Sequence, residues 1–379
     1  MNKTLGICAL VITVSALLAG CERPPIIAVQ GGPAGTAMDQ IYNPRTLAKQ
    51  AAMNAVPEAS PPAPVQAGGP TAGQIYQNVK VLGDLSVGEF ARTMVAMTEW
   101  VSPQQGCNYC HVEGNFADES KYTKVVSRRM LQMTQHLNGE WKQHVGESGF
   151  TCFTCHRGNP VPQNVWYAPK SSRLDTAAMG GMSGMNRAAP SVGLSSLPSD
   201  PFSDYLLDDK PIRVNGPVPM AGRGAAANRQ SSMQAEHTYG LMVHMSQSLG
   251  VNCTYCHNTQ SFQDWNVSPP QRVIAYHGIR MTRDLNQNFL NAEPLTSVFP
   301  ANRRGPTGDI AKVNCTTCHQ GAFKPLYGAK MAEDYPAMQL PDKRNDANAA
   351  TAAPVVPTAV TPATPTAVAP EAAAPKVGG

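Results

Sequence analysis

The chain has 379 residues and a formal net charge of +4, with 15% charged and only 6% aromatic residues. Aromatic side chains supply much of the buried apolar area of an ordinary core, so we expect a bound apolar group to fill part of this interior. Lysine and arginine form no run interleaved with aromatic residues. The positive charge therefore does not indicate nucleic-acid binding, and we expect no nucleic-acid partner.

Residues 1–20 have the pattern of a secretory signal peptide: a basic start at Lys3, an apolar run and two small residues. The apolar run is shorter than a transmembrane helix needs. Leu-Ala-Gly-Cys, which ends at Cys21, resembles the bacterial lipoprotein signal, whose cysteine carries a diacylglycerol. We expect Cys21 to anchor the chain to the membrane through two acyl chains. The alternative is ordinary secretion with a free thiol at Cys21.

Both ends of the mature chain have compositions that disfavour a packed core. Residues 21–74 are rich in proline, alanine and glycine, which predicts an extended segment behind the lipid anchor. Residues 344–379 are almost entirely alanine, proline, threonine and valine, which predicts a disordered tail. The chemistry is therefore expected between residues 75 and 343.

The sequence C-x-x-C-H occurs four times in this middle region. Two cysteines at this spacing can form thioether bonds to the two vinyl groups of one porphyrin, and the adjacent histidine then binds the iron as its proximal ligand. Four copies, which use eight of the ten cysteines, predict four haem c groups. The predicted attachment residues are Cys107, Cys110, Cys152, Cys155, Cys253, Cys256, Cys315 and Cys318, and the predicted proximal ligands are His111, His156, His257 and His319.

Two other kinds of site also use C-x-x-C pairs: zinc ribbons and thioredoxin-like dithiols. Neither requires a histidine after every second cysteine, so both explain the sequence less well than haem attachment does.

A helical pattern precedes each motif. Ser86 to Glu89, for example, form a capping box at the start of an apolar stripe. A methionine in a helix usually packs in the core, but a methionine ahead of every haem motif is a candidate sixth ligand of iron. The expected helices cover residues 86–101, 119–137, 239–249 and 270–285, and they carry Met94, Met130, Met242 and Met281.

Residues 171–229, between the second and third motifs, show few periodic stretches and include a methionine-rich run at 179–185. We expect a connector with little regular structure. A copper site is the alternative explanation of the methionines, although methionine is also a common packing residue.

The haem region divides into two similar halves, residues 75–170 and 230–343. The motifs that begin the halves share a tyrosine before the second cysteine, and the motifs that end them share a threonine there. Each half also contains an Arg-Met pair, at Arg129-Met130 and Arg280-Met281. Duplication of a two-haem unit explains these features economically. It predicts a mainly α fold with two pseudo-symmetric haem pairs.

The most specific matches to a known family lie in four segments: Ser86–Met94, Gly106–His111, Trp141–Gly146 and Gly278–Met281. They resemble the tetrahaem cytochrome subunit of purple-bacterial photosynthetic reaction centres, over about residues 75–340. That family has a helical fold in which each haem lies along a helix, with its attachment motif in the following turn. Many members carry a lipid-modified N-terminal cysteine, which Cys21 would match.

The resemblance implies a sixth ligand for each iron. The first three haems would take a methionine opposite the motif histidine: Met94 for His111, Met130 for His156 and Met242 for His257.

The fourth haem is the exception, because the family uses a histidine from the first half. That histidine corresponds to His144, opposite His319. The internal repeat alone favours Met281, the counterpart of Met130. We favour His144 because it lies in the matching Trp-x-x-His-Val-Gly context. A second imidazole would give haem 4 a lower potential than a Met/His haem in similar surroundings. Arg272 and Arg280 are candidate tuning charges beside propionates, with solvated or paired helix charges as the alternative.

The resemblance also implies a function, electron relay on the periplasmic face of the photosynthetic membrane. Such subunits accept electrons from a soluble c-type cytochrome or a high-potential iron-sulfur protein. They pass them to the photo-oxidised bacteriochlorophyll pair of the reaction-centre membrane subunits. Their haems follow the spatial order 1, 2, 4, 3, with haem 3 nearest the bacteriochlorophylls. For electron transfer the protein has to set the distances between the haems, their potentials and the docking of the soluble carrier, and it needs no substrate pocket.

Two other classes of protein contain the same motifs. Periplasmic multihaem enzymes, such as nitrite or hydroxylamine converters, need an iron with an open position for substrate. Four candidate sixth ligands for four irons favour an electron-transfer protein over such an enzyme. Respiratory quinol-oxidising tetrahaem proteins usually have a membrane-spanning N-terminal helix and mostly histidine ligation, which the short apolar run before Cys21 fits poorly.

Overall fold

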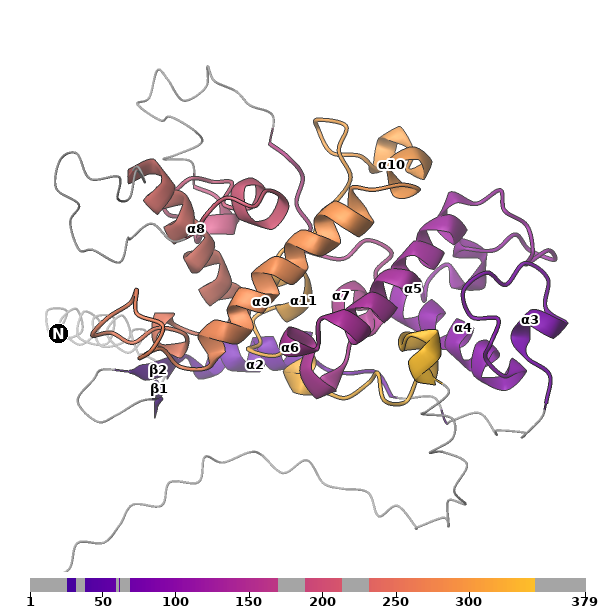
Figure 1. The fold of residues 1–379 in the computed structure, drawn as a ribbon, viewed down its shortest axis with the longest axis horizontal. Coiled ribbons are helices and arrows are strands. Elements are labelled where there is room, and N and C mark those ends of the chain that lie inside the picture. Colours follow the sequence, from indigo (N-terminus) through magenta and orange to yellow (C-terminus); the bar gives the residue numbers. More distant parts are fainter. Residues whose placement is uncertain are drawn as a thin grey trace, which may run out of the picture.

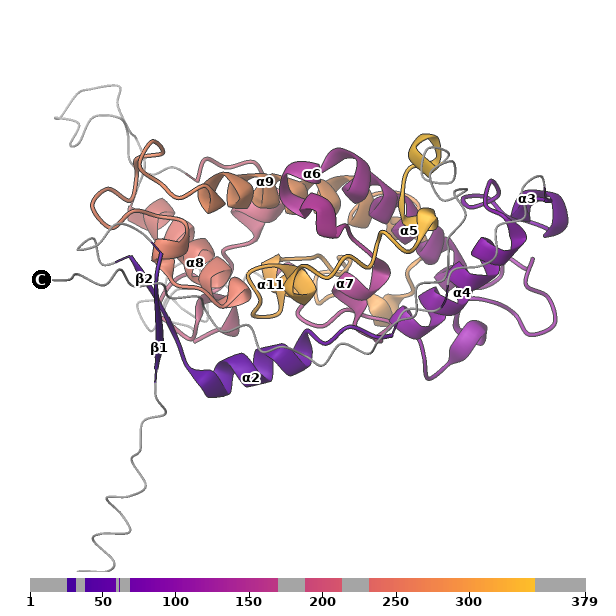
Figure 2. The ribbon, with the colours of Figure 1, turned by 90° about the horizontal axis from the view of Figure 1, so that it is seen from below.

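The computed structural model shows an elongated, mainly helical chain with a short two-stranded hairpin at one end (Figure 1, Figure 2). The hairpin pairs β1 (Ile27–Gln30) with β2 (Asp39–Tyr42) in antiparallel register. Cys21 with the expected signal peptide, the methionine-rich run and the expected tail beyond Arg344 lie outside the described residues. The structure describes residues 26–31, 38–58, 61, 69–169, 188–212 and 232–344.

The helices of the first half confirm the expected capping and periodicity. α4 (Val87–Val101) begins after Ser86, whose Oγ accepts a hydrogen bond from Glu89 N at 3.2 Å. The second helix begins later than residue 119, because Glu119 stays in the preceding loop and binds the Arg128 guanidinium at 2.6 and 2.7 Å. The other elements of this half are η1 (Gly106–Tyr109), α5 (Tyr122–Glu140), α6 (Lys142–Val145), η2 (Gly146–Ser148) and α7 (Cys152–His156).

The second half repeats this order of helix and motif. α8 (Ser232–Leu249) begins earlier than the expected residue 239, because its first turns bond to the connector: Thr238 Oγ1 lies 2.8 Å from the Tyr205 hydroxyl. α9 follows Pro270, as predicted. The remaining elements are η6 (Cys253–Tyr255), α9 (Gln271–Asp284), η7 (Leu285–Leu290), α10 (Leu295–Val298), η8 (Ala301–Arg303), α11 (Cys315–His319), η9 (Pro325–Gly328) and η10 (Pro336–Met338).

The expectation of an extended segment over residues 21–74 is wrong for part of that range. α2 (Pro44–Met53) is a ten-residue helix, and the short α3 (Ala72–Ile75) follows it. Asn43 caps α2 by accepting a hydrogen bond from Arg45 N at 2.9 Å, and a proline at the first helical position suits a helix start. The alanine-rich composition obscured this start signal.

The described part of the connector is also more ordered than expected. It forms the 3-10 turn η4 (Pro190–Val192) and the π-helical turn η5 (Ser203–Leu207). Tyr205 and Leu206 are fully buried and pack with Leu241 of α8 and Ile279 of α9. The apolar side chains that anchor this segment are Phe202, Tyr205, Leu206, Leu207 and Ile212, and they do not follow a regular helical or strand period in the sequence.

The two halves share a core. One cluster joins Met133 and Leu137 of α5 to Met281 of α9 and to Leu285 and Phe289 of η7. A second cluster packs α4 against the end of the described chain, where Trp100 meets Tyr335 at a ring-centroid distance of 4.7 Å. The halves therefore cannot separate without exposing apolar surface, so the haem motifs are held at fixed positions.

The end of the described chain is fastened by a buried ion pair. Arg344 is fully buried, and its Nη1 donates to both carboxylate oxygens of Asp84 at 2.6 and 2.8 Å. The tail was expected to begin at residue 344, but Arg344 itself belongs to the packed structure.

We expect Asp84→Asn to lower the free energy of unfolding by about 2 kcal/mol, because it leaves the buried Arg344 guanidinium without its counter-charge. The loss is smaller than for a fully buried pair, since the Asp84 side chain is 39% exposed. Chemical denaturation measures it. Asp342→Asn, which removes an exposed carboxylate two residues from Arg344, is the control, and an equal effect of both substitutions would contradict the prediction.

Candidate haem sites

Each C-x-x-C-H motif folds as a short helical turn. The motifs at Cys107 and Cys253 form the 3-10 turns η1 and η6, whereas those at Cys152 and Cys315 form α7 and α11. Cysteines three positions apart lie on one side of a helical turn, so both thiols of a motif can bond to the same group. The two kinds of turn occur in the same order in both halves.

Each motif histidine is held in one tautomer by a backbone carbonyl. Nδ1 of His111 and of His257 lies 3.1 and 2.8 Å from the carbonyl oxygen five residues later. Nδ1 of His156 and of His319 lies 2.8 and 2.9 Å from the carbonyl oxygen three residues later. A hydrogen bond from Nδ1 leaves Nε2 unprotonated and free to bind a metal. All four histidines therefore present the nitrogen that an axial ligand of iron needs.

Burial keeps these imidazoles neutral. Desolvation lowers the pKa of His319 to about 4, and it also lowers the pKa of His156, His111 and His257. Neutral imidazole is the form that binds metals. The environment of the motifs thus favours the ligating state.

The thiols do not fit a dithiol redox centre or a zinc site. Burial raises the pKa of Cys152 to about 12 and that of Cys256 to about 11, whereas a redox dithiol needs a stabilised thiolate. In the part of the chain that the structure describes, no three His, Cys, Asp or Glu side chains gather as a metal site. Thioether attachment to a haem, which leaves the sulfur neutral, fits these surroundings.

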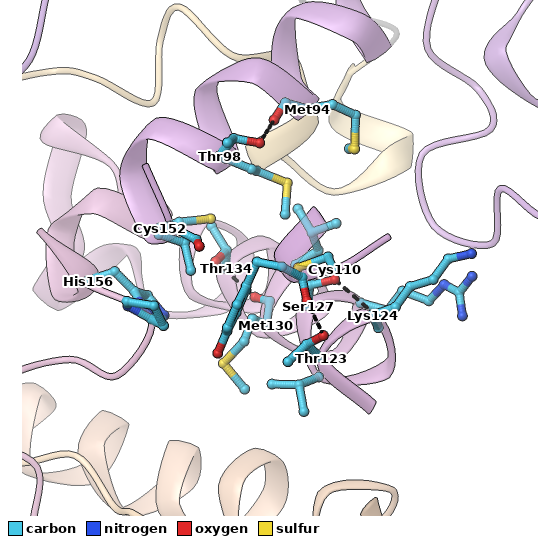
Figure 3. Close-up of a pocket in the computed structure, with 18 of the residues that line it drawn as sticks. Met94, Thr98, Cys110, Thr123, Lys124, Ser127, Met130, Thr134, Cys152 and His156 are labelled. Atoms are coloured by element: carbon cyan, nitrogen blue, oxygen red, sulfur yellow. Dashed lines mark hydrogen bonds between the residues drawn. The ribbon is translucent and has the colours of Figure 1, made fainter. Parts of the chain in front are cut away.

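A cavity of about 500 Å³ joins the two motifs of the first half (Figure 3). Met94 enters its lining from α4 and Met130 from α5, and its walls are mainly apolar, with Leu82, Phe90 and Leu131 among them. Its size lies in the range of cofactor sites. The same cavity is lined by the motif residues Cys107, Cys110, His111, Cys152, Cys155 and His156. The residues predicted to hold haems 1 and 2 therefore line one space.

His144 lies against His319, as the family resemblance implied. The centroids of the two rings are 6.0 Å apart. Two imidazoles that share a metal at about 2 Å from each nitrogen have centroids at about this separation. The indole Nε1 of Trp141 donates to Asp284 Oδ2 at 2.8 Å. This bond holds the start of α6 against α9 and brings His144 to its place.

The other candidate ligand of the fourth iron, Met281, is buried in the core shared by the halves, together with Met133 and Leu285. Met242 lies on α8, partly buried beside Phe202 and Tyr205. It precedes η6, the motif of the third haem, just as Met94 on α4 precedes η1.

A contact series of four helices runs along the long axis of the molecule (Figure 2): α7 and α11 carry the second and fourth motifs, and α4 and α8 are the helices before the first and third motifs. α4 contacts α7, where Gly158 N donates to Trp100 O at 2.9 Å. α7 contacts α11, where the neighbouring Cys318 thiol raises the pKa of Cys155. α11 contacts α8, where Gly321 N donates to a backbone carbonyl at 2.8 Å. With α4 standing for the first motif, which it contacts, and α8 for the third motif, which follows it in the chain, the order along the series is first, second, fourth, third.

Arg157 is a residue that the sequence reasoning missed. It lies at the junction of α7 and α11, and its guanidinium donates to Cys318 O at 3.1 Å and to Asn54 Oδ1 at 3.3 Å. The sequence did contain a signal for this residue. The two motifs that end the halves are followed by different residues, the cation Arg157 in the first half and the uncharged Gln320 in the second. Both residues end their motif helix in the left-handed conformation, with φ of 48° and 47°.

The two expected tuning charges have other partners in the structure. Arg272 donates to Ser268 Oγ at 2.7 Å and stacks on Trp265, and Arg280 lies over the Tyr276 ring. Their role beside propionates remains a prediction.

The N-terminal segment closes over the second half. Gln40 Nε2 donates to Asn252 Oδ1 and Thr254 Oγ1 at 2.5 and 2.8 Å, and Asn54 Nδ2 donates to Gln320 O at 3.2 Å. α2 runs along one side of the contact series (Figure 2). A segment expected to be extended thus fastens the third and fourth motifs to the rest of the chain.

Paired thiols, neutral histidines and a helix ahead of each motif define a multihaem c-type cytochrome. The family model "Photosynthetic reaction centre cytochrome C subunit" matches residues 22–339. The chain therefore belongs to the family of photosynthetic reaction centre cytochrome c subunits, whose haem is of the c type, and the resemblance found in the sequence is confirmed. Among the described helices, none combines the length and the apolar composition that a membrane span requires.

Individual relatives agree with the family model. The chain is 57% identical over 330 residues to the photosynthetic reaction center cytochrome c subunit of Rubrivivax gelatinosus, covering 86% of this chain and 87% of the relative. It is 48% identical over 336 residues to the subunit of Thermochromatium tepidum, covering 89% and 81%. It is also 27% identical over 301 residues to cytochrome c-554 of Chloroflexus aurantiacus, covering 67% and 71%.

We expect Arg157→Gln to lower the potentials of the haems attached at Cys155 and Cys318 by roughly 50 mV each, because a nearby cation favours the reduced iron and contributes about 1 kcal/mol at an effective dielectric constant near 20. A redox titration monitored by absorption measures the shift. Arg157→Lys, which keeps the charge, should shift both potentials less. Equal shifts in the two variants would show that packing, and not charge, is the cause.

Proposed function

We propose that this chain carries four haem c groups and relays electrons from a soluble periplasmic carrier to the photo-oxidised bacteriochlorophyll pair of a photosynthetic reaction centre. Family membership supports the destination of the electrons. The observation that carries the relay is the contact series of α4, α7, α11 and α8, the helices that carry or precede the four motifs, since electron transfer needs cofactors in close succession. Haem supplies a one-electron centre, and the protein supplies its position and its potential.

Closed coordination of every iron is the chemical basis of the proposal. The motif histidines would bind one face of each iron through Nε2. Met94, Met130 and Met242 would close the other face of haems 1, 2 and 3, and His144 would close haem 4. The separation of 6.0 Å between the rings of His144 and His319 supports the last pair. An iron closed on both faces exchanges electrons without binding a substrate.

The contact series supports the order 1, 2, 4, 3 for the haems. It puts the histidine-ligated haem 4 between haem 2 and haem 3. Methionine raises and a second histidine lowers a haem potential, so an electron would cross one centre of lower potential on its way. Transfer onto haem 4 would be uphill in energy. A relay can still work if the haems lie close together, because the following transfer from haem 4 to its neighbour is then fast.

The partners follow from the family. Reaction-centre membrane subunits with bacteriochlorophyll receive the electron near haem 3, and a soluble c-type cytochrome or a high-potential iron-sulfur protein delivers it from the periplasm. A diacylglycerol on Cys21 holds the chain at the periplasmic face of the membrane after removal of residues 1–20. The tail beyond residue 344 has no assigned role in the relay.

Internal duplication accounts for the arrangement of the sites. Both halves show the same order of histidine hydrogen bonds. The first motif histidine of each half bonds to the carbonyl five residues later, and the second bonds to the carbonyl three residues later. Such an alternation supports two pseudo-symmetric haem pairs derived from one two-haem unit.

The competing function is a multihaem oxidoreductase with one open iron. Carbon monoxide binds rapidly only to a reduced haem with a vacant position. We expect no rapid binding by the reduced protein, and binding to about one haem in four in His144→Ala, because that substitution opens haem 4. Rapid-mixing absorption spectroscopy measures the uptake.

His277→Ala is the matched control, because His277 lies on α9 next to the His144 contact and is assigned to no iron. It should leave carbon monoxide binding as it is in the unaltered protein. Rapid uptake by the unaltered protein would contradict the relay and favour the enzyme.

A further inference from the structure

The structure changes the register in which the two halves correspond. The Arg-Met pairs of the sequence align Met130 with Met281. The burial pattern favours a shift of three residues: Leu131–Thr134 are buried, exposed, buried and buried, and Ile279–Thr282 repeat this pattern. Met133 and Met281 then correspond, and both belong to the core cluster shared by the halves. In this register Met130, the predicted ligand of haem 2, corresponds to Gly278.

In the register set by burial, a threonine hydrogen bond falls at the same position of α5 and α9, and α4 has the same bond after Met94. In α4, Thr98 Oγ1 donates to the carbonyl of Met94 at 2.9 Å, and in α5 Thr134 Oγ1 donates to the carbonyl of Met130 at 2.9 Å (Figure 3). In α9 the bond joins Thr282 Oγ1 to the carbonyl of Gly278 at 2.8 Å. The residue four positions before each threonine is a predicted methionine ligand in α4 and α5, and it is a glycine in α9.

The space that a side chain at position 278 would take is occupied by the His144 ring. A Cβ built on Gly278 would lie 2.5, 2.8 and 3.1 Å from Cε1, Nδ1 and Nε2 of His144. Carbon atoms do not approach ring atoms this closely without displacement. His144 Nδ1 also lies 2.9 Å from Ile274 O, one turn earlier on α9. The bare backbone at Gly278 thus gives the imidazole its space, and the Ile274 carbonyl one turn earlier is its hydrogen-bond partner.

We propose that Gly278 stands at the position of a methionine ligand that the second half lacks, and that its missing side chain determines that haem 4 takes His144 as its sixth ligand. The inference rests on the proposed ligation of haem 4 by His144 and His319. Gly278 is a positioning residue, because it acts through the imidazole and does not touch the iron. Glycine is unfavourable inside a helix compared with alanine, so its presence in α9 is explained by the ring packed on it.

The first test is Gly278→Ala in the haem-loaded protein. A methyl group here would push the His144 ring away from His319. Near-infrared magnetic circular dichroism distinguishes bis-histidine from histidine–methionine ligation, and a redox titration follows the potential of each haem. We expect the bis-histidine signal of one haem in four to be lost, with a change in one potential only.

Gly139→Ala is the matched control. Gly139 lies within α5, and a Cβ there would come within 2.3 Å of Leu340 Cδ1, but it touches no predicted ligand. It should affect stability while leaving the bis-histidine signal and all four potentials unchanged. A general loss of packing would therefore not imitate the expected result.

The second test restores the ligand that the repeat lacks. In the double variant Gly278→Met with His144→Ala, the new methionine stands in the register of Met130. We expect the long-wavelength absorption of methionine-ligated ferric haem to rise from three to four haem equivalents, and the potential of haem 4 to rise with it. His144→Ala alone should show three equivalents and an open fourth haem.

Two results would overturn the role of Gly278 alone: a bis-histidine signal that persists in Gly278→Ala, or a double variant with the spectrum of His144→Ala. If the unaltered protein has no bis-histidine haem, the ligation itself is wrong and the inference fails with it. The unaltered protein therefore separates a failure of the ligand assignment from a failure of this inference.

Discussion

The hydrogen bond from Nδ1 of each motif histidine to a backbone carbonyl is the constraint from which the rest of the structure follows. It fixes the tautomer, so that Nε2 is the free nitrogen, and it ties the ring to the turn that also carries the two cysteines. His144 obeys the same rule with a carbonyl from α9. Five imidazoles are thus oriented by main-chain atoms, which are more rigid than side-chain partners.

Rigid turns alone would not make a relay, because electron transfer also depends on the spacing between cofactors. That spacing is set by the shared core of α5, α9 and η7, and by the junction where α7 meets α11. At this junction the Cys318 thiol raises the pKa of Cys155, and the Arg157 guanidinium donates to Cys318 O. The two halves meet at haem attachment sites, so the connection between them lies on the proposed electron path.

Much of the fold was accessible from the sequence because its signals are local. The C-x-x-C-H spacing, the cap at Ser86 and the helices ahead of each motif depend on neighbouring residues, and the structure has the helices where they were expected, within a few residues except at the start of α8. The start of α2 was missed because Asn43-Pro44 stands in a segment whose composition suggested an extended chain. The packing of Tyr205 and Leu206 was missed because isolated apolar residues in a connector create no period.

The features that the sequence could not supply depend on long-range contact. His144 and His319 are far apart in the chain, and only the resemblance to a family pointed to their pairing. The sequence alone favours the register that pairs Arg280-Met281 with Arg129-Met130, because the burial pattern behind the proposed shift of three residues is a tertiary property. A glycine in a helix carries no signal for the ring that packs on it.

Time-resolved absorption after a single flash, on membranes that contain this chain with its reaction centre, tests the central claim most directly. The account predicts that the haem attached at Cys253 and Cys256 is oxidised first, and that the oxidised state then moves along the contact series to the haem at Cys107 and Cys110. Two results together would contradict it: no haem is oxidised in membranes that contain the chain, and the bacteriochlorophyll pair is re-reduced there at the same rate as in membranes that lack the chain.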